Sequence, residues 1–376
     1  MDILVIGNGF DLAHGLKTDY GSFLKFLKVV SDCMDGVKAD GFFEFDQLSS
    51  EYDFCYEYCM GMLTNEDKKE IREIFCQTAT RNIWVKHFQS VYEEREQKGK
   101  TGWIDFESEI SFIIQILDKI KQSVNEQTIS HGDSIEVDPG LSNYINNFLW
   151  GTEESHTTMF SVDKIDEIED SLVSDLNDLT RCLEIYLADF IEKQDLPTRL
   201  PDIQELYPQR VLSFNYTNTC EEHYFPVGKD IKYDYIHGKA DVNHTVENCN
   251  IVLGIDEYLK EEEKQRTDFI RFKKYYQRIY KKTGCAYRDW LEEMKKCNEN
   301  NLYIFGHSLD VTDADVLGSL ILAPNTVTTI FYYSQKAFSQ QIVNLVKIIG
   351  QDNLTAMVHG AHPSIIFKPQ QDAEEI

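Results

Sequence analysis

Residues 1–20 read MDILVIGNGFDLAHGLKTDY, and this opening stretch decides the fold. The apolar run Ile3–Ile6 predicts a short buried strand that continues directly into Gly7, Asn8 and Gly9. Glycines at this place allow a sharp turn and a close approach of the backbone to a phosphate or ribose, which a Cβ would obstruct. The dinucleotide fingerprint requires a third glycine where this chain has Leu12, so the usual hydride-transfer motif is not satisfied. An ordinary tight turn, with Asp11 bonding its own backbone, is the alternative.

The length and the charge of the chain limit its class. With 376 residues and 42% hydrophobic side chains, it can form one large domain or two ordinary ones. The formal net charge of -27 disfavours non-specific binding to nucleic acid or to an anionic membrane. No run approaches the roughly 18 apolar residues of a membrane helix, and the N-terminus lacks a basic leader and a cleavage site. We therefore expect a cytoplasmic protein.

The nine cysteines form no C-x-x-C pair, and reduced thiols are expected. Cys55 and Cys59 could share one face of a helix, but a zinc site needs a second pair at comparable spacing, which the sequence lacks. We therefore expect no metal.

Short apolar runs that resemble strands lie at both ends of the chain, and several alternate with helical patterns. This alternation is typical of an α/β fold with a Rossmann-like, mostly parallel sheet. We expect a single domain over 1–376 whose sheet comes from about 1–30 and 205–360, with helical insertions at about 31–204 and 257–298. The predicted strands are Ile3–Ile6, Arg210–Phe214, Tyr233–Ile236, Asn250–Leu253, Leu302–Phe305 and Val327–Tyr333.

Three other segments have distinct patterns. WIDFESEISFIIQIL at 103–117 predicts a helix, with one apolar face that includes Phe106 and Ile110 and with Asp105 as its cap. The polar segment 131–158 predicts a long surface loop or lid, and KPQQDAEEI at the C-terminus predicts a frayed tail. RFKKYYQRIYKKTGCAY at 271–287 is the one basic stretch, and it predicts a solvated helix or a surface for a partner.

Polar side chains follow the second predicted strand, in VLSFNYTNT at 211–219. This stretch delivers Ser213, Asn215, Thr217 and Asn218 at the carboxyl end of the strand, where open α/β sheets place their ligands. A neutral amide can hold a water or a ribose hydroxyl without titrating. A strand followed by an ordinary polar turn is the alternative.

A histidine follows the next strand, in YDYIHGK at 233–239. His237, which precedes Gly238, can act as a general base near neutral pH. A competing pair, His359 and Gly360, lacks an Asn-bearing strand shortly before it, and we rank it second.

Glycine also ends two later strands. In LYIFGHSLDVTDADVL at 302–317, Gly306 is followed by Ser308 and Asp313, side chains that suit a ribose or an adenine edge. Asp313 alternatively caps the helix that follows. Gly254 in IVLGIDE at 251–257 is equally able to line a cleft.

The order of these motifs resembles the sirtuin superfamily and its bacterial SIR2-like defence relatives, in which the corresponding groups surround NAD. The chain resembles the AbiH family of phage abortive-infection proteins more closely. This second resemblance is carried by ILVIGNGFDLAHGLKTDYGSFL, FNYTNT, IHG, LGID and IFGHSLDVTDADVL. The positions that match the sirtuin pattern are Gly7, Gly9, Asn215, His237, Gly306 and Ser308.

Two departures from the sirtuin pattern limit what the resemblance implies. Sirtuin deacylases carry Gly-Ala-Gly-Ile-Ser and a zinc module with paired cysteines, and this chain has neither, so protein deacylation is not expected. Thr217 stands where the sirtuin motif ends in aspartate.

The resemblance implies a phage-defence effector that binds NAD and hydrolyses its nicotinamide–ribose bond. Asn215 would hold the ribose and the attacking water, and His237 would accept a proton. Gly7, Asn8 and Gly9 would face the diphosphate, while His14 would brace the loop or, alternatively, contact the ribose. The other expected cofactor-binding residues are Asp11, Ser213, Thr217, Gly238, Gly254, Gly306, Ser308 and Asp313.

Two other functions stay open. The same pocket could serve a nucleotide-sensing module that holds NAD or ADP-ribose without turnover, or the chain could be a toxin acting on nucleic acid. The expected partners are a small-molecule nucleotide, a phage-encoded trigger and a second copy of the chain.

Overall fold

The computed structural model describes residues 1–39, 53–99, 104–131, 135–136, 139–150, 159–196, 198–225, 230–259 and 265–375. Six parallel strands form its central sheet in the order β6-β5-β1-β7-β8-β9. Numbered along the chain, this is the doubly wound order 3-2-1-4-5-6, which reverses between β1 and β7. The predicted α/β class is confirmed. The strands are Asp2–Ile6 (β1), Arg210–Ser213 (β5), Lys232–Tyr235 (β6), Asn300–Phe305 (β7), Thr326–Tyr332 (β8) and Ile365–Pro369 (β9).

Both faces of the sheet are covered, as the sequence of β1 requires. Its alternate residues belong to different apolar clusters, because Ile3 and Val5 pack on one face while Leu4 and Ile6 pack on the other. The helices around the sheet are α1 (Gly9–Ala13), α9 (Pro201–Gln204), α10 (Thr219–His223), α12 (Tyr287–Met294), α13 (Ala314–Ile321), α14 (Gln335–Ile349) and α15 (Gln351–His359).

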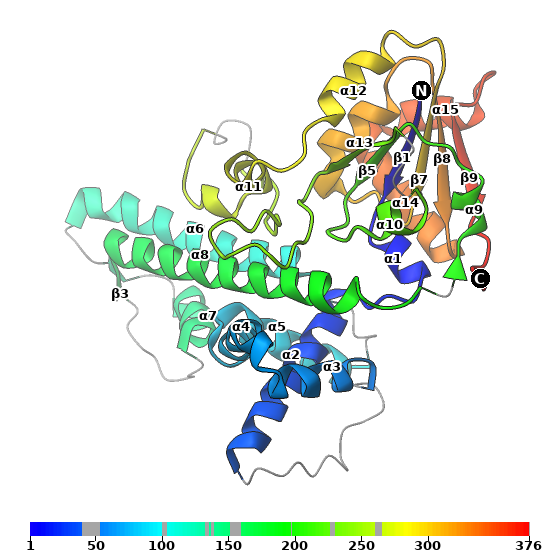
Figure 1. Ribbon diagram of the computed structural model, residues 1–376. Coiled ribbons are helices and arrows are strands. Elements are labelled where there is room, and N and C mark those ends of the chain that lie inside the picture. Colours follow the sequence, from blue (N-terminus) through cyan, green and yellow to red (C-terminus); the bar gives the residue numbers. More distant parts are fainter. Residues whose placement is uncertain are drawn as a thin grey trace.

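The segment between β1 and β5 is mainly helical and gathers at the carboxyl ends of the strands, where Figure 1 shows α6 and α8 running side by side. Asp105 caps α6 by accepting from the backbone N–H of Glu107 (3.1 Å), as predicted. The helices are α2 (Tyr20–Ala39), α3 (Asp53–Thr64), α4 (Lys69–Arg81), α5 (Ile83–Gln97), α6 (Phe106–His131), α7 (Pro139–Trp150) and α8 (Val162–Ile185), and α8 continues into a π-helical turn at Tyr186–Ile191. None of the helices in the described residues is long and apolar enough to cross a membrane.

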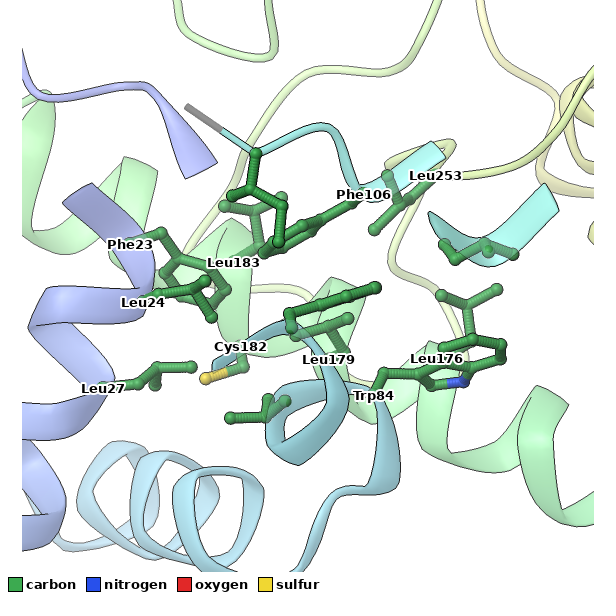
Figure 2. Packing of buried hydrophobic residues seen from close by; sticks show 14 of the residues in the cluster. Phe23, Leu24, Leu27, Trp84, Phe106, Leu176, Leu179, Cys182, Leu183 and Leu253 are labelled. Atoms are coloured by element: carbon green, nitrogen blue, oxygen red, sulfur yellow. The ribbon is translucent and has the colours of Figure 1, made fainter. Parts of the chain in front are cut away.

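A second apolar core fills this helical part (Figure 2). Trp84, which is fully buried, donates its indole N–H to the carbonyl of Leu172 (2.9 Å), and Phe88 stacks on Phe106 with ring centroids 4.0 Å apart. Leu253, from the chain that follows β6, packs into the same core. Apolar packing of the segment after β6 therefore connects the helical part to the sheet.

Several local predictions are wrong. Asn250–Leu253 is irregular instead of a strand, and two of its side chains, Ile251 and Leu253, pack in the helical core. The predicted loop at 131–158 contains α7, while 132–134, 137–138 and 151–158 lie outside the described residues. The predicted frayed tail contributes to β9 and to β10 (Glu374–Glu375), which pairs with β4 (Thr198–Arg199); Ile376 lies outside the described residues.

The basic stretch is also different from its prediction. It forms α11 (Lys274–Lys281), and Lys273 and Lys274 at its start are 0% and 4% exposed. The prediction of a solvated helix is therefore wrong for these two cations. Each has an acidic partner, as buried charges require: Lys273 contacts Glu257 (2.9 Å) and Lys274 contacts Glu107 (2.7 Å).

Candidate functional site

The glycine turns after β1 and β7 lie against each other. Gly7 and Gly9 donate their backbone N–H groups to the carbonyls of Phe305 (3.1 Å) and Gly306 (2.8 Å). Gly306 has a φ of 66°, and a Cβ there would lie 2.1 Å from the backbone nitrogen of Phe10. These glycines therefore allow two loops to pack backbone on backbone. The two amides donate within the protein, which differs from the expected contact with a diphosphate.

The neighbouring Asn8 also bonds within its own loop, because its side-chain oxygen accepts from the hydroxyl of Thr18 (2.6 Å). His14 contacts the carbonyl of Phe10 (2.7 Å) and the hydroxyl of Tyr224 (2.6 Å), which is the bracing role expected of it.

Asp11 joins the end of β1 to the end of β5. Its Oδ2 accepts from Asn215 Nδ2 (3.1 Å) and from Thr217 Oγ1 (2.6 Å). Burial raises the pKa of Asp11 to about 6, although the hydroxyl of Thr217 opposes the change. Asp11 Oδ1 and Asn215 Oδ1 are buried without a hydrogen-bond partner among the described residues. The pair therefore offers two acceptors to a ligand with hydroxyl groups.

Ser213 shapes the turn that presents Asn215. Its hydroxyl donates to the carbonyl of Asn215 (3.0 Å) and accepts from the backbone N–H of the same residue (3.1 Å). This local ring of hydrogen bonds uses the hydroxyl for the backbone turn, while Asp11 holds the amide side chain of Asn215.

His237, after β6, meets Asp313, which precedes α13. His237 Nε2 lies 3.2 Å from Asp313 Oδ1, and His307 Nε2 lies 3.5 Å from Asp313 Oδ2. Burial lowers the pKa of His237 to about 4 despite the nearby carboxylate, so the imidazole is neutral at pH 7. A proton on Nε2 facing Asp313 leaves a lone pair on Nδ1, which is buried without a partner among the described residues.

Asp313 stands at the N-cap position of α13, but its side chain contacts charged groups instead of the helix backbone. Its side chain makes no capping hydrogen bond, so the alternative prediction of a helix cap is wrong. Its carboxylate lies 3.8 Å from Lys274 Nζ and 3.7 Å from Arg278 Nη2, both on α11. Burial alone would raise the pKa of Asp313, but Lys274 and His237 hold it well below its usual range. The carboxylate therefore stays ionised.

Lys274, Arg278 and Glu107 are not among the predicted site residues. Lys274 and Arg278 are four apart in the sequence, a spacing that places them on one face of a helix. This spacing is the available signal, but only the three-dimensional fold shows that the face points inward. Glu107 comes from α6, in the other insertion, and lies in the stretch WIDFE, which was interpreted only as the start of a helix.

The remaining predicted residues either allow close backbone packing or are exposed. Gly238 has a φ of 87° and lies against the carbonyl of Asn250, and Gly254 lies against the carbonyl of Phe272, so both allow close backbone packing. Ser308 is exposed, and His359 is exposed at the end of α15. Neither takes part in the buried cluster.

Phe214, the residue before Asn215, contacts the histidine side of the site. Its ring lies 5.5 Å from the ring of His237 and 4.5 Å from that of His307. The key side chains are nearly inaccessible: Asp11 is 1% exposed, Asn215 4%, His237 5% and Asp313 6%. A substrate can therefore contact them only after part of the surrounding chain moves.

The site has no feature of a metal centre. Among the described residues, no group of three or more His, Cys, Asp and Glu side chains is placed to hold a metal ion.

A recess of about 10 Å³, which has room for about one water, is lined in part by Glu192, Asn218 and Thr219.

The described groups fit NAD in their chemistry. The free oxygens of Asp11 and Asn215 can accept from ribose hydroxyls, and Arg278 can attract a phosphate. Asp11 and Asn215 follow the carboxyl ends of β1 and β5, close to the point between β1 and β7 where the strand order reverses and such folds bind dinucleotides.

The family model described as "Bacteriophage abortive infection AbiH" matches residues 3–333, which extend from β1 to the end of β8 and include every residue of the buried cluster. No curated protein matches the chain.

Proposed function

Because the chain belongs to the AbiH family of bacteriophage abortive-infection proteins, we propose that it is a defence effector that binds NAD and hydrolyses the nicotinamide–ribose bond. The observation that carries the proposal is the set of buried, unpaired polar atoms at the ends of three neighbouring strands. Asp11 Oδ1, Asn215 Oδ1 and His237 Nδ1 lie after β1, β5 and β6. An unsatisfied buried polar atom is costly, so a cluster of them indicates a ligand.

The two oxygens would hold the ribose. Asp11 is fixed by its hydrogen bonds to Asn215 and Thr217, so its free oxygen has a defined position. Acceptors fixed in this way orient a sugar without the entropy loss of ordering a mobile side chain.

His237 would take the proton in the reaction. The bond from the ribose to the nicotinamide nitrogen breaks, a bond to a water oxygen forms, and the water proton passes to His237 Nδ1. The positive charge of the nicotinamide ring makes it a good leaving group, and the sugar develops oxocarbenium character in the transition state. Asp313 holds the imidazole with Nε2–H toward its carboxylate, in the way that a carboxylate orients the base of a catalytic triad.

The closed site suits an effector that must not consume NAD in a healthy cell. The reacting groups are buried, and Asp313 beside His237 contacts Lys274 of α11, which pairs with Glu107 of the helical insertion, so binding requires these segments to move. An infection signal that moves them would start the reaction.

The test measures growth and NAD together in cells that express the protein. We expect the native chain to arrest growth while NAD falls, and Asn215→Ala and His237→Ala to lower the rate of NAD loss by at least about 100-fold. His359→Ala is the matched control, because this exposed histidine also precedes a glycine.

Growth arrest at constant NAD would refute the hydrolase assignment. NAD that binds to purified protein without release of nicotinamide would indicate a sensing module instead. Degraded RNA or DNA at constant NAD would indicate a nucleic-acid toxin.

A further inference from the structure

The ion pair between Lys274 and Glu107 connects the two helical insertions next to Asp313. Lys274 starts α11 and Glu107 lies in the first turn of α6, and their charged atoms are 2.7 Å apart. Lys274 is 4% exposed and also faces Asp313 at 3.8 Å. One ammonium group therefore lies between a carboxylate of the helical part and the carboxylate that contacts His237.

We propose that Lys274 and Glu107 are a positioning pair that sets the charge state of His237 through Asp313. The catalytic meaning of this inference rests on the proposed function, whereas the charge state of His237 can be measured without any substrate.

The sign of the effect follows from electrostatics in a buried cluster. Lys274 balances two carboxylates, those of Glu107 and Asp313. Without the ammonium charge, Asp313 attracts a proton to His237 more strongly, and the imidazole becomes cationic at a higher pH. Burial raises the pKa of Glu107 to about 7, so Glu107 is protonated at the lower pH where His237 titrates, and its replacement by Gln removes little charge there.

The two halves of one ion pair therefore have unequal effects on the imidazole: loss of Lys274 raises the pH at which it titrates, and loss of Glu107 does not. A purely structural ion pair would not behave in this way, because loss of either partner leaves the other charge buried and destabilises the fold in both cases. The other titratable or charged groups of the cluster that bear on His237 are Asp313, His307, Arg278, Asp256 and Tyr216.

The chain contains a closely matched control in the preceding residue. Lys273 is fully buried, like Lys274, and is also paired with a glutamate, Glu257, at 2.9 Å. Its ammonium group is not among those that contact Asp313. Lys273→Met therefore removes a buried lysine of the same kind without changing the charges next to His237.

The experiment is a pH titration of the histidine ring signals by NMR on the full chain without ligand, with His237 assigned by a His237→Gln variant. We expect Lys274→Met to move the titration midpoint of His237 up by about one pH unit or more. Glu107→Gln should not raise it, Lys273→Met should leave it unchanged, and Lys274→Arg should restore the native value. Thermal unfolding verifies that each variant is folded, and Lys274→Gln replaces Lys274→Met if the latter does not fold.

The inference is overturned if the midpoint stays unchanged in the folded Lys274 variant, or if Glu107→Gln raises it. This outcome is separate from the fate of the proposed function. A native protein that never releases nicotinamide but shows these shifts would refute NAD hydrolysis and support the positioning pair. Nicotinamide release by a native protein whose variants show no shift would support NAD hydrolysis and refute the positioning pair.

Discussion

Replacing Gly306 by alanine tests whether the two glycine turns must pack backbone on backbone. An added Cβ would lie 2.1 Å from the nitrogen of Phe10 and 2.5 Å from the carbonyl carbon of Gly9. Carbon atoms pack best at about 3.5–4.0 Å, so one loop has to move. The moving atoms belong to the backbone, which cannot rotate away as a side chain can, and the shift would break the hydrogen bond from Gly9 N–H to the carbonyl of Gly306 (2.8 Å).

Gly99 is a control residue that shares the backbone conformation of Gly306 but not its steric clash. It has the same φ of 66°, and a Cβ there would meet nothing within 4 Å. Gly99→Ala should therefore lower the free energy of unfolding by about 1 kcal/mol, the cost of the left-handed conformation. Gly306→Ala should lower it by at least about 3 kcal/mol, since overpacking adds about 2 kcal/mol or more. Urea unfolding of the three proteins measures both values. Equal losses in the two variants would refute the close packing of the turns.

Two further predictions concern buried charges. Because the pKa of Asp11 rises from 3.8 to about 6 on folding, the folded state holds the extra proton between about pH 4 and pH 6, and stability falls as the pH rises through this window. Between pH 4 and pH 7, the free energy of unfolding measured with urea should fall by up to about 3 kcal/mol less in Asp11→Asn than in the native protein. An equal fall in both proteins would contradict the raised pKa of the buried carboxyl. Arg181→Ala should cost about 3–5 kcal/mol, because it leaves the fully buried Glu184 without the cation 2.6 Å away. The control Lys98→Ala breaks only an exposed pair with Glu94 and should cost less than about 1 kcal/mol; a similar loss in both would show that burial is not the cause.

Five of the six strands of the sheet were predicted, because each includes a short run typical of strands next to glycine or polar residues, whereas β9 was not predicted. Five of the six predicted runs are strands, and their parallel pairing follows from the helical segments between them. Asn250–Leu253 has the same composition but pairs with no strand. Its residues bond elsewhere: the N–H of Val252 donates to the carbonyl of His237 (2.8 Å), and that of Leu253 donates to Gln277 Oε1 (3.1 Å). An apolar run shows that a segment is buried, but it does not show which core receives it.

Some residues of the candidate site could likewise be predicted from the sequence, and others could not. Asp11, Asn215 and His237 were predictable, because each follows a strand and the carboxyl ends of parallel strands share one edge. Lys274 and Glu107 were not, because they come from helices whose orientation depends on tertiary packing. Composition alone predicts a solvated helix for the basic stretch. Lys274 is buried instead, because its ammonium group has acidic partners in Glu107 and Asp313.

The contacts around His237 also indicate how a signal could reach the site. The carbonyl of His237 accepts from Val252, whose neighbour Leu253 packs in the core of the helical part (Figure 2). On the side-chain face, Asp313 contacts Lys274, which pairs with Glu107 of α6. Both the backbone and the imidazole of His237 are thus joined to the helical insertion, one by apolar packing and one by charge. A partner that displaces this insertion must therefore disturb the surroundings of His237, so a trigger need not enter the buried site to change its chemistry.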